Sequence, residues 1–220
     1  MTSLLTRFFR HYKNKPYKYL GVARHSETLE ELALYESLYD NQLGRIWVRP
    51  KDMFFESIEL DGKSRPRFEQ VRFDLVEKTQ IDDGDWDGLA EVYQEGFQNE
   101  LSRSKVSGRL TEAKNPSVLF LYDQGKLVAF KVGYAKDTTT YYSWIGAVRK
   151  DYRGLGLATE LMKAQHDWCK KQGYTKIQTK SRNQFAEMLR LNIKFGFEIT
   201  DVVHEANGKS KIIMEKTLTT

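Results

Sequence analysis

The stretch Ser143–Met162 constrains the fold more than any other part of the sequence. It begins as an apolar strand that runs to Val148, passes through a basic turn and reaches two glycines, Gly154 and Gly156. Apolar residues then recur at helical spacing, which predicts a helix after the second glycine. The first backbone N–H groups of a helix have no partner inside it, and the helix dipole adds positive charge there. Strand, glycine turn and helix start therefore predict an anion site, because glycine lets a phosphate approach the backbone closely.

The residues of the turn exclude two common phosphate-binding motifs. A P-loop ends in Gly-Lys-Ser/Thr, and Leu155-Gly156-Leu157 has no such lysine. A dinucleotide-binding fingerprint needs a third glycine, which is absent. What remains, Arg153–Ala158, resembles the Arg/Gln-x-x-Gly-x-Gly/Ala signature of the GCN5-related N-acetyltransferase (GNAT) family. One departure is Lys150, where many family members carry proline.

A second stretch, Leu189–Phe197, resembles another motif of that family, Leu-Tyr-x-Lys-x-Gly-Phe, with Asn192 in the place of tyrosine. The resemblance covers residues 73–220. It implies an α+β fold, the GNAT acetyltransferase fold, with a mixed sheet. Alternation and helical spacing predict the matching elements in order. Strands are expected at residues 71–77, 117–122, 127–135, 141–148, 175–179, 197–203 and 211–215, and helices at 86–97, at 157–172 and after Asn183, which can act as its N-cap. Residues 100–115 are polar and show no clear period, so we expect them to be irregular.

Residues 1–72 are predicted to form a separate, small, β-rich domain. They resemble DUF1653, a small bacterial domain of unknown function, in His11–Lys13, Leu20–Thr28, Trp47–Pro50, Met53–Phe54 and Pro66–Phe68. Two interpretations of residues 28–38 stay open, a helix capped by Thr28 or a strand through Leu32–Tyr35. The resemblance brings no chemistry with it. A ligand-binding face that uses His25, Trp47 and Arg49 is left open.

Composition narrows the class of protein. Of 220 residues, 40% are hydrophobic and 30% charged, which is typical of a soluble globular protein. No apolar run approaches the length of a membrane span, so no membrane partner is expected. Cys169 is the only cysteine and the four histidines lack metal-ligand spacing, so we expect no intrachain disulfide, no metal and a cytoplasmic location. The net charge of +5 comes with no nucleic-acid motif, so the basic start is interpreted as a solvated face. The oligomeric state stays open, a homodimer being one option.

The GNAT resemblance implies acetyl-CoA as co-substrate and a small-molecule or peptide amine as acceptor, attacked directly in a ternary complex. It implies that backbone groups around Ala147 and Val148 bind the pantetheine and that Asn183 contacts the cofactor. The pyrophosphate would be held by a set of consecutive residues, Arg153, Gly154, Leu155, Gly156, Leu157, Ala158 and Thr159.

Two side chains are candidates for the catalytic centre. Tyr142 would line the acceptor site, and Asn192 would donate to the cofactor sulfur or else bond neighbouring backbone. The sequence does not identify the general base, for which Glu112 is one candidate. A second function class, a non-catalytic acyl-CoA sensor, fits the same motifs.

Overall fold

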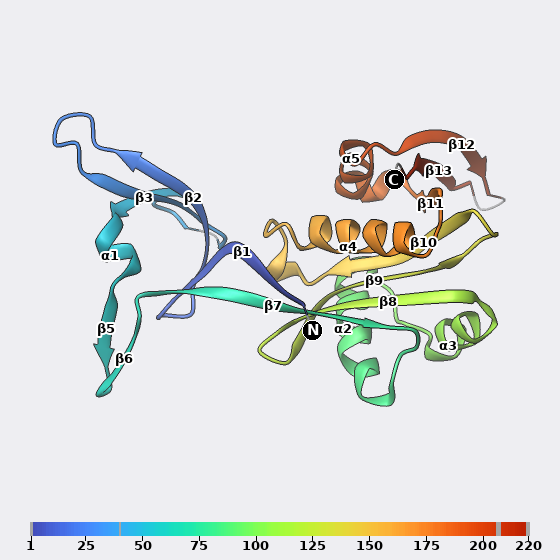
Figure 1. The fold of residues 1–220 in the computed structure, drawn as a ribbon, viewed down its shortest axis with the longest axis horizontal. Helices are drawn as coiled ribbons and strands as arrows, with labels where there is room; N and C mark the ends of the chain where they lie inside the picture. The colour runs from blue at the N-terminus through green and yellow to red at the C-terminus, as the bar shows by residue number, and fades with distance from the viewer. Residues whose placement is uncertain (1, 40, 206–207, 219–220) are drawn as a thin grey trace. The chain divides into compact units, whose positions relative to one another are not determined.

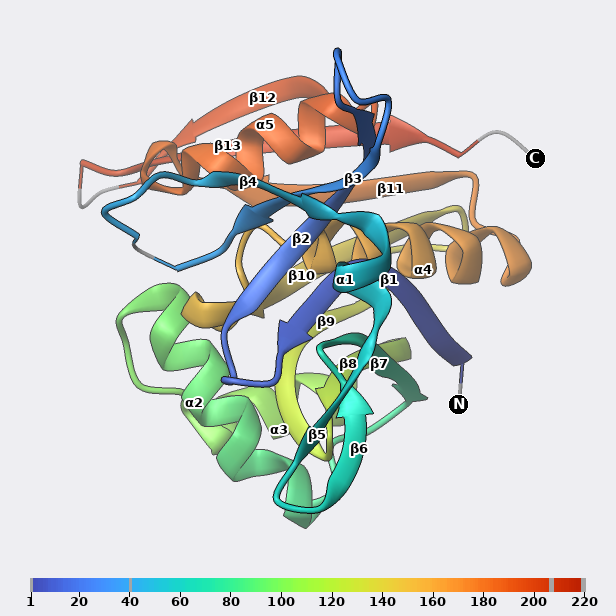
Figure 2. The ribbon, with the colours of Figure 1, turned by 90° about the vertical axis from the view of Figure 1, so that its left-hand side faces the viewer.

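The computed structural model describes residues 2–39, 41–205 and 208–218, which form two compact units. Unit 1 contains Leu75–Lys150 and the chain from Gly156 onward, and unit 2 contains Thr2–Asp74 and Asp151–Leu155. Figures 1 and 2 show the ribbon in two views. Strand β7 (Phe68–Lys78) carries the chain from unit 2 into unit 1.

Unit 1 is built on a mixed sheet with the strand order β12-β13-β11-β10-β9-β8, followed by the end of β7. Its strands are β8 (Lys114–Asp123), β9 (Lys126–Ala135), β10 (Thr140–Val148), β11 (Lys176–Ser181), β12 (Glu198–His204) and β13 (Ser210–Thr217). Strands β10 and β11 are parallel, whereas β8–β9, β9–β10, β11–β13 and β12–β13 are antiparallel. The predicted α+β class with a mixed sheet is therefore confirmed.

Helices cover both faces of this sheet (Figure 1). On one face lie α2 (Trp86–Phe97) and α3 (Arg103–Glu112), and on the other α4 (Leu157–Lys171) and α5 (Ala186–Lys194). Each face has its own buried core. Leu89 and Val92 of α2 pack with Phe130 and Val132 of β9, while Trp168 of α4 packs with residues such as Tyr141 and Met214. In the described chain, none of the helices combines the length and apolar character needed to cross a membrane.

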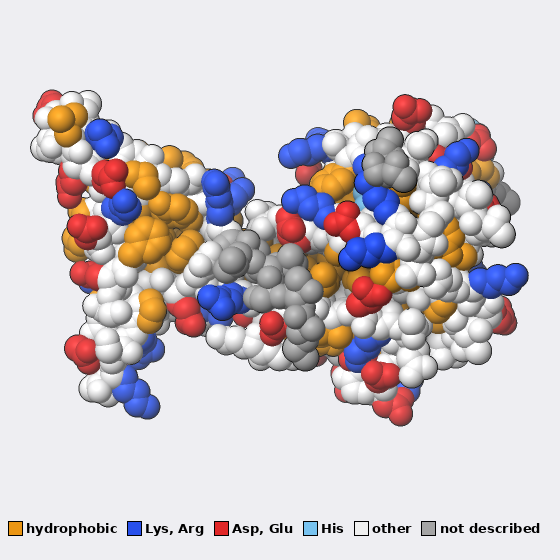
Figure 3. Space-filling view, viewed as in Figure 1, with side chains coloured by type: hydrophobic (Ala, Val, Ile, Leu, Met, Phe, Trp, Pro, Cys, Tyr) orange, Lys and Arg blue, Asp and Glu red, His pale blue; other side chains and the backbone are white. Residues whose placement is uncertain are grey.

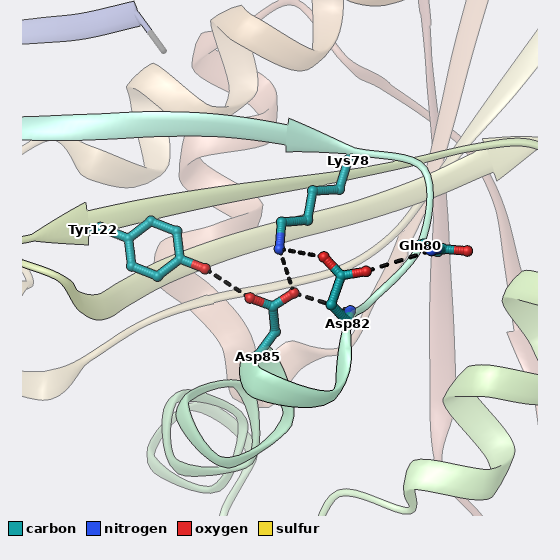
Figure 4. A network of polar contacts seen from close by, with 5 residues as sticks. All are labelled: Lys78, Gln80, Asp82, Asp85 and Tyr122. Atoms are coloured by element: carbon teal, nitrogen blue, oxygen red, sulfur yellow. Dashed lines mark hydrogen bonds and ion pairs between the residues drawn. The ribbon is translucent and has the colours of Figure 1, made fainter.

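A polar network fixes the start of α2 (Figure 4). The Lys78 ammonium donates to Asp82 at 2.8 Å and to Asp85 at 2.7 Å, and the Tyr122 hydroxyl donates to Asp85 at 3.0 Å. Hydrogen bonds to the two carboxylates raise the pKa of Lys78, and burial followed by Asp85 raises the pKa of Tyr122 to about 12. The network joins the end of β7, the strand β8 and the short 3-10 turn η1 (Asp83–Asp85) that precedes α2.

The structure corrects two expectations in unit 1. Residues 100–115 are not irregular, because α3 occupies most of them, with Val106 and Leu110 buried and the Ser102 hydroxyl accepting from the Lys105 N–H. Asn183 is not a helix cap. It is the first residue of a 3-10 turn, η3 (Asn183–Phe185), which has Arg182 at its N-cap position and no side-chain cap.

Unit 2 is an antiparallel sheet around an aromatic core. Its strands follow the order β7-β1-β2-β3-β4, with β1 (Thr2–His11), β2 (Pro16–Arg24), β3 (Glu31–Ser37) and β4 (Ile46–Pro50). A one-turn helix, α1 (Lys51–Phe55), and a hairpin of β5 (Ser57–Leu60) and β6 (Lys63–Pro66) follow. Phe54 and Phe68 stack with ring centres 4.2 Å apart, and Phe9 and Tyr35 pack beside them. Figure 3 shows hydrophobic side chains gathered beside α1, where Met53 and Phe55 are exposed.

The segment 28–38, for which two interpretations were open, forms strand β3. The helix alternative capped by Thr28 is wrong, since alternate residues from Ala33 to Ser37 are buried, as in a strand with one face on a core.

Unit 2 also contains Tyr152, whose ring packs edge-on against that of Phe73 with the ring centres 6.1 Å apart.

Candidate active site

The site is organised around the position where β10 and β11 stop pairing. Their parallel register runs from Thr140 opposite Lys176 to Ser143 opposite Thr179, and among the described residues it goes no further. The Thr179 hydroxyl donates to the Ser143 carbonyl at 3.0 Å and closes this last pair. Directly after it, Trp144 is an extra residue in the pairing of β10 with β9. Because a bulge bends its strand, β10 turns away from β11 at Trp144.

The polar backbone groups beyond the bulge alternate in direction. The Arg149 N–H donates to the Val128 carbonyl of β9 at 2.9 Å, in the same register that pairs Ala147 with Phe130. In an antiparallel ladder every second residue bonds the same neighbour. The N–H and C=O of Ala147 are therefore directed to β9, and those of Val148 to the side of β11. Of the two residues expected to bind pantetheine, Val148 has the suitable backbone direction, and Ala147 contributes its side chain.

The turn before α4 has the backbone that the anion site requires. Gly154 and Gly156 have φ of 79° and 84°, in the left-handed region that glycine adopts without strain. A Cβ built on either glycine would meet no heavy atom within 4 Å, so both face open space. Gly156 is the N-cap of α4 and has no side-chain cap, which leaves the first N–H groups of the helix to an outside partner. This cradle fits a phosphate group.

The other residues predicted to bind the pyrophosphate differ in how far their side chains are exposed to solvent. Arg153 is exposed, whereas the side chains of Leu155 and Leu157 are buried, so these two can offer only their backbone. Ala158 and Thr159 are half-buried in the first turn of α4.

A buried arginine that the sequence did not single out ties α2 to the end of β10. The Arg149 side chain donates from Nε to the Leu127 carbonyl at 2.8 Å, from Nη1 to Glu95 at 3.0 Å and from Nη2 to Glu91. The Lys150 N–H also donates to Glu95, at 2.7 Å. The hydrogen bond from Arg149 holds the pKa of the Glu91 carboxyl below its usual value. The turn that leads to the glycines thus starts from a fixed point on α2.

Three aromatic rings cover the sheet at the bulge, on the face of α2 and α3. The ring centre of Tyr134 lies 5.4 Å from that of Tyr142 and 5.9 Å from that of Trp144. All three side chains are half-buried. Burial, with a smaller effect of Tyr134, raises the pKa of Tyr142 to about 12, so its hydroxyl is neutral at ordinary pH. We call Tyr134, Tyr142 and Trp144 the aromatic patch.

Asn192 lies on the opposite face. It is 2% exposed, and its amide Nδ2 donates to the Met214 sulfur at 3.6 Å, not to neighbouring backbone. Met214 belongs to the core under α4 together with Tyr141. Because successive residues of a strand point to opposite faces, Tyr142 points away from that core. The structure does not bring the two predicted catalytic side chains together on one face.

Carboxylates near the aromatic patch are candidates for the general base. Glu112 is the last residue of α3. Glu215, which the sequence did not single out, accepts from the Gln178 amide at 2.6 Å. The registers place Tyr142 opposite Gln178 and Gln178 opposite Glu215, so the three share one face of the sheet. Because Met214 and Glu215 are successive residues, the alternation of β13 could have predicted that they point to opposite faces of the sheet. Nothing in the sequence linked Glu215 to Tyr142. Asn183 is exposed at the start of η3, two residues after β11 ends.

Comparison with known proteins identifies this arrangement. The sequence profile of the acetyltransferase (GNAT) family matches residues 81–197, more than half of the chain. The chain belongs to the GNAT acetyltransferase family. Members of this family use acetyl-CoA, which agrees with the cradle before α4. A second profile, of a protein family of unknown function (DUF1653), matches residues 7–70 and confirms the order of the two predicted resemblances.

Solved structures share the fold of the GNAT part. Ard1 from Thermoplasma volcanium matches with a TM-score of 0.58 and 18% identity, covering 66% of this chain and 99% of that one. The ribosomal-protein-S18-alanine N-acetyltransferase from Escherichia coli matches with a TM-score of 0.57 and 18% identity, over 67% and 96%. A GNAT acetyltransferase from Elizabethkingia anophelis with acetyl-CoA bound matches with a TM-score of 0.53 and 18% identity, over 66% and 98%. No curated protein matches the chain significantly.

Proposed function

We propose that this GNAT protein transfers the acetyl group of acetyl-CoA to a primary amine, which attacks directly in a ternary complex. The observation that carries the proposal is the end of β10–β11 pairing at Ser143 and Thr179, on the strand that leads through a short turn into the glycine cradle of α4. A strand whose partner ends beside it can take an extended ligand in that partner's place. The pantetheine arm is such a ligand, and the cradle lies along the chain where its pyrophosphate would follow.

Each part of the proposed site has a physical role. The backbone from Arg153 to Thr159 holds the pyrophosphate with N–H groups and the dipole of α4. Val148 holds the pantetheine through its backbone, with Ala147 packing beside it, and Asn183 contacts the cofactor from the start of η3. Bound acetyl-CoA supplies the thioester. Holding both reactants in register lowers the entropic part of the barrier.

The remaining residues act on the amine and on the leaving group. Tyr142 lines the acceptor side as a neutral phenol. Glu215 and Glu112 are the carboxylates through which the amine can lose its proton, directly or by way of water. The Asn192 amide has a second N–H besides the one it donates to Met214, and this N–H stabilises the departing thiolate by a hydrogen bond without protonating it. One solved structure with this fold is named for an alanine of ribosomal protein S18 and another for an aminoglycoside, which supports a small-molecule or peptide amine as the acceptor class.

We further propose that residues 73–220 form the catalytic domain and residues 1–72 a separate domain. The fragment 73–220 should then keep acetyl-CoA binding, measured by calorimetry. A soluble, folded fragment that binds none would contradict this boundary.

The test of the function is a panel of primary amines, including short peptides with free N-termini, with detection of released CoA. We expect CoA release that requires both acetyl-CoA and one amine class. The second candidate, a non-catalytic acyl-CoA sensor, is favoured by the asparagine at position 192 where the family motif has tyrosine. Tight acetyl-CoA binding with no release above the hydrolysis rate, for any amine, would support the sensor instead.

A further inference from the structure

Two cations lie over the aromatic patch. The guanidinium of Arg109, on α3, is 5.2 Å from the ring centre of Trp144, and its Nη1 donates to the Tyr134 hydroxyl at 3.1 Å. The ammonium of Lys180, on β11, is 5.8 Å from the ring centre of Tyr142. Both cations are exposed. They come from the two sides of the position where β10 and β11 part, since Lys180 is the first β11 residue beyond the last pair.

Most of the hydrogen-bonding capacity of Arg109 is unused. A guanidinium has five N–H donors, and the bond to the Tyr134 hydroxyl uses one of them. Among the described residues, none of the ion pairs involves Arg109 or Lys180. The hydrogen bond to Tyr134 raises the pKa of Arg109, and Glu112, on the same helix, adds only a small effect in the same direction.

The same helix offers an internal contrast. Arg103 of α3 also lies over a tryptophan, Trp86, at 5.0 Å, but its guanidinium is paired with the Asp83 carboxylate. Helix α3 therefore carries two arginine–tryptophan stacks. The one away from the aromatic patch is neutralised by a carboxylate of the chain, and the one on the patch keeps its charge.

We propose that the acceptor carries a carboxylate close to its amine, and that Arg109 binds this carboxylate while Lys180 adds positive charge beside it. This inference rests on the proposed function, which places the pantetheine arm along β10 on the C-terminal side of the bulge at Trp144. The planar fork of arginine matches a carboxylate with two parallel hydrogen bonds. The rings of the aromatic patch contact the apolar body of the acceptor.

The first measurement uses the full-length protein with saturating acetyl-CoA and acceptors that differ only by a carboxylate: L-lysine against cadaverine, and L-phenylalanine against phenethylamine. We expect kcat/KM to favour the acid in at least one pair. Arg109→Gln should reduce this preference by about tenfold to a hundredfold, as expected for hydrogen bonds between charged groups. Lys180→Gln should reduce it less, and the matched control Arg103→Gln should keep the wild-type ratio. Comparing ratios between variants cancels the different basicities of the two amines.

The second measurement needs no turnover. Calorimetry on the CoA-saturated protein compares N-acetyl-L-phenylalanine with N-acetylphenethylamine, and the acid should bind more tightly only while Arg109 is present. If this holds but no amine is acetylated, the proposed function fails and the carboxylate site stands. If amines are acetylated but the carboxylate-free member is preferred in both pairs, the inference is overturned and the proposed function stands. An Arg109→Gln variant that changes neither the kinetic ratio nor the calorimetric difference also overturns the inference.

Discussion

Gly96 of α2 and Ala147 of β10 meet where the helix crosses the strand, so closely that a Cβ on Gly96 would lie 2.7 Å from the Ala147 Cβ. Real Cβ atoms do not approach so near, so glycine is the residue that lets α2 seat on this strand. One residue on, Val148 directs its backbone to the side of β11. The next residue, Arg149, forms ion pairs with Glu91 and Glu95 of the same helix. Helix α2 is thus attached to the end of β10, the strand to which we assign the pantetheine.

Replacing Gly96 with alanine should damage both stability and cofactor binding. The added methyl forces α2 away from Ala147, and such overpacking costs about 1–3 kcal/mol of unfolding free energy. We expect a lower Tm and a higher Kd for acetyl-CoA. Gly108→Ala is the matched control, since Gly108 lies in α3 with nothing within 4 Å of its Cβ position. That change should leave binding intact and stabilise the helix by ~0.5–1 kcal/mol. Equal melting curves for the two variants would contradict the close contact.

His166 should make the fold sensitive to acid. Its side chain is 6% exposed, and burial, followed by nearby Lys216, lowers its pKa from 6.5 to about 3. The unfolded chain therefore takes up a proton at higher pH than the folded one, so stability is complete above pH 6.5 and is lost as the pH falls toward 3. Between pH 7 and pH 5 this amounts to about 2 kcal/mol.

The variant His166→Phe removes the titrating group and keeps ring contacts with Phe195 and Phe197, which lie at 5.9 and 5.6 Å. Denaturant unfolding at both pH values measures the effect. We expect the variant to lose less stability than the wild type between pH 7 and pH 5. The same loss in both proteins would show that His166 does not carry the acid sensitivity.

Asn192 should contribute one hydrogen bond to catalysis. Asn192→Ala is expected to lower kcat about tenfold, in line with a bond worth ~1–1.5 kcal/mol. Met214→Leu is the control, because it removes the sulfur that accepts from Asn192 at 3.6 Å and nearly conserves volume. It should leave kcat close to wild type. Steady-state kinetics on the best amine, with melting curves, distinguish the outcomes. A thousandfold loss in a folded Asn192→Ala protein, or an equal loss in Met214→Leu, would contradict a single catalytic hydrogen bond.

The sequence predicts the parts of the site that depend on local structure. The strand ending at Val148, the glycine turn and helix α4 follow from apolar spacing and from glycines at left-handed positions, so a short window of the chain contains the whole signal.

Features that depend on distant partners could not be predicted. In the sequence, Arg149 is part of a basic turn. In the structure it is buried, because it donates hydrogen bonds to carboxylates 54 and 58 residues earlier in the chain. Helix α3 buries only Val106 and Leu110, too few apolar residues for a period to appear in a polar segment. The bulge at Trp144 and the cation of Arg109 above it require the pairing of β10 with β9 and the seating of α3, which no local pattern encodes.

The most direct test of the account compares two glycines that flank α4. Gly156 precedes the helix and Gly173 follows it, and both have φ of 84° and open space at the Cβ position. A glutamate at either site would have to adopt the left-handed backbone conformation, which costs ~1–2 kcal/mol. Gly156→Glu and Gly173→Glu should therefore lower the Tm by similar amounts. Only the first would set bulk and negative charge against the pyrophosphate.

The measurement is calorimetric titration of both variants with acetyl-CoA. We expect wild-type affinity for Gly173→Glu and, for Gly156→Glu, a Kd raised about a hundredfold or more, which is ~3 kcal/mol. A folded Gly156→Glu protein that binds acetyl-CoA as tightly as Gly173→Glu would contradict the placement of the cofactor at the start of α4.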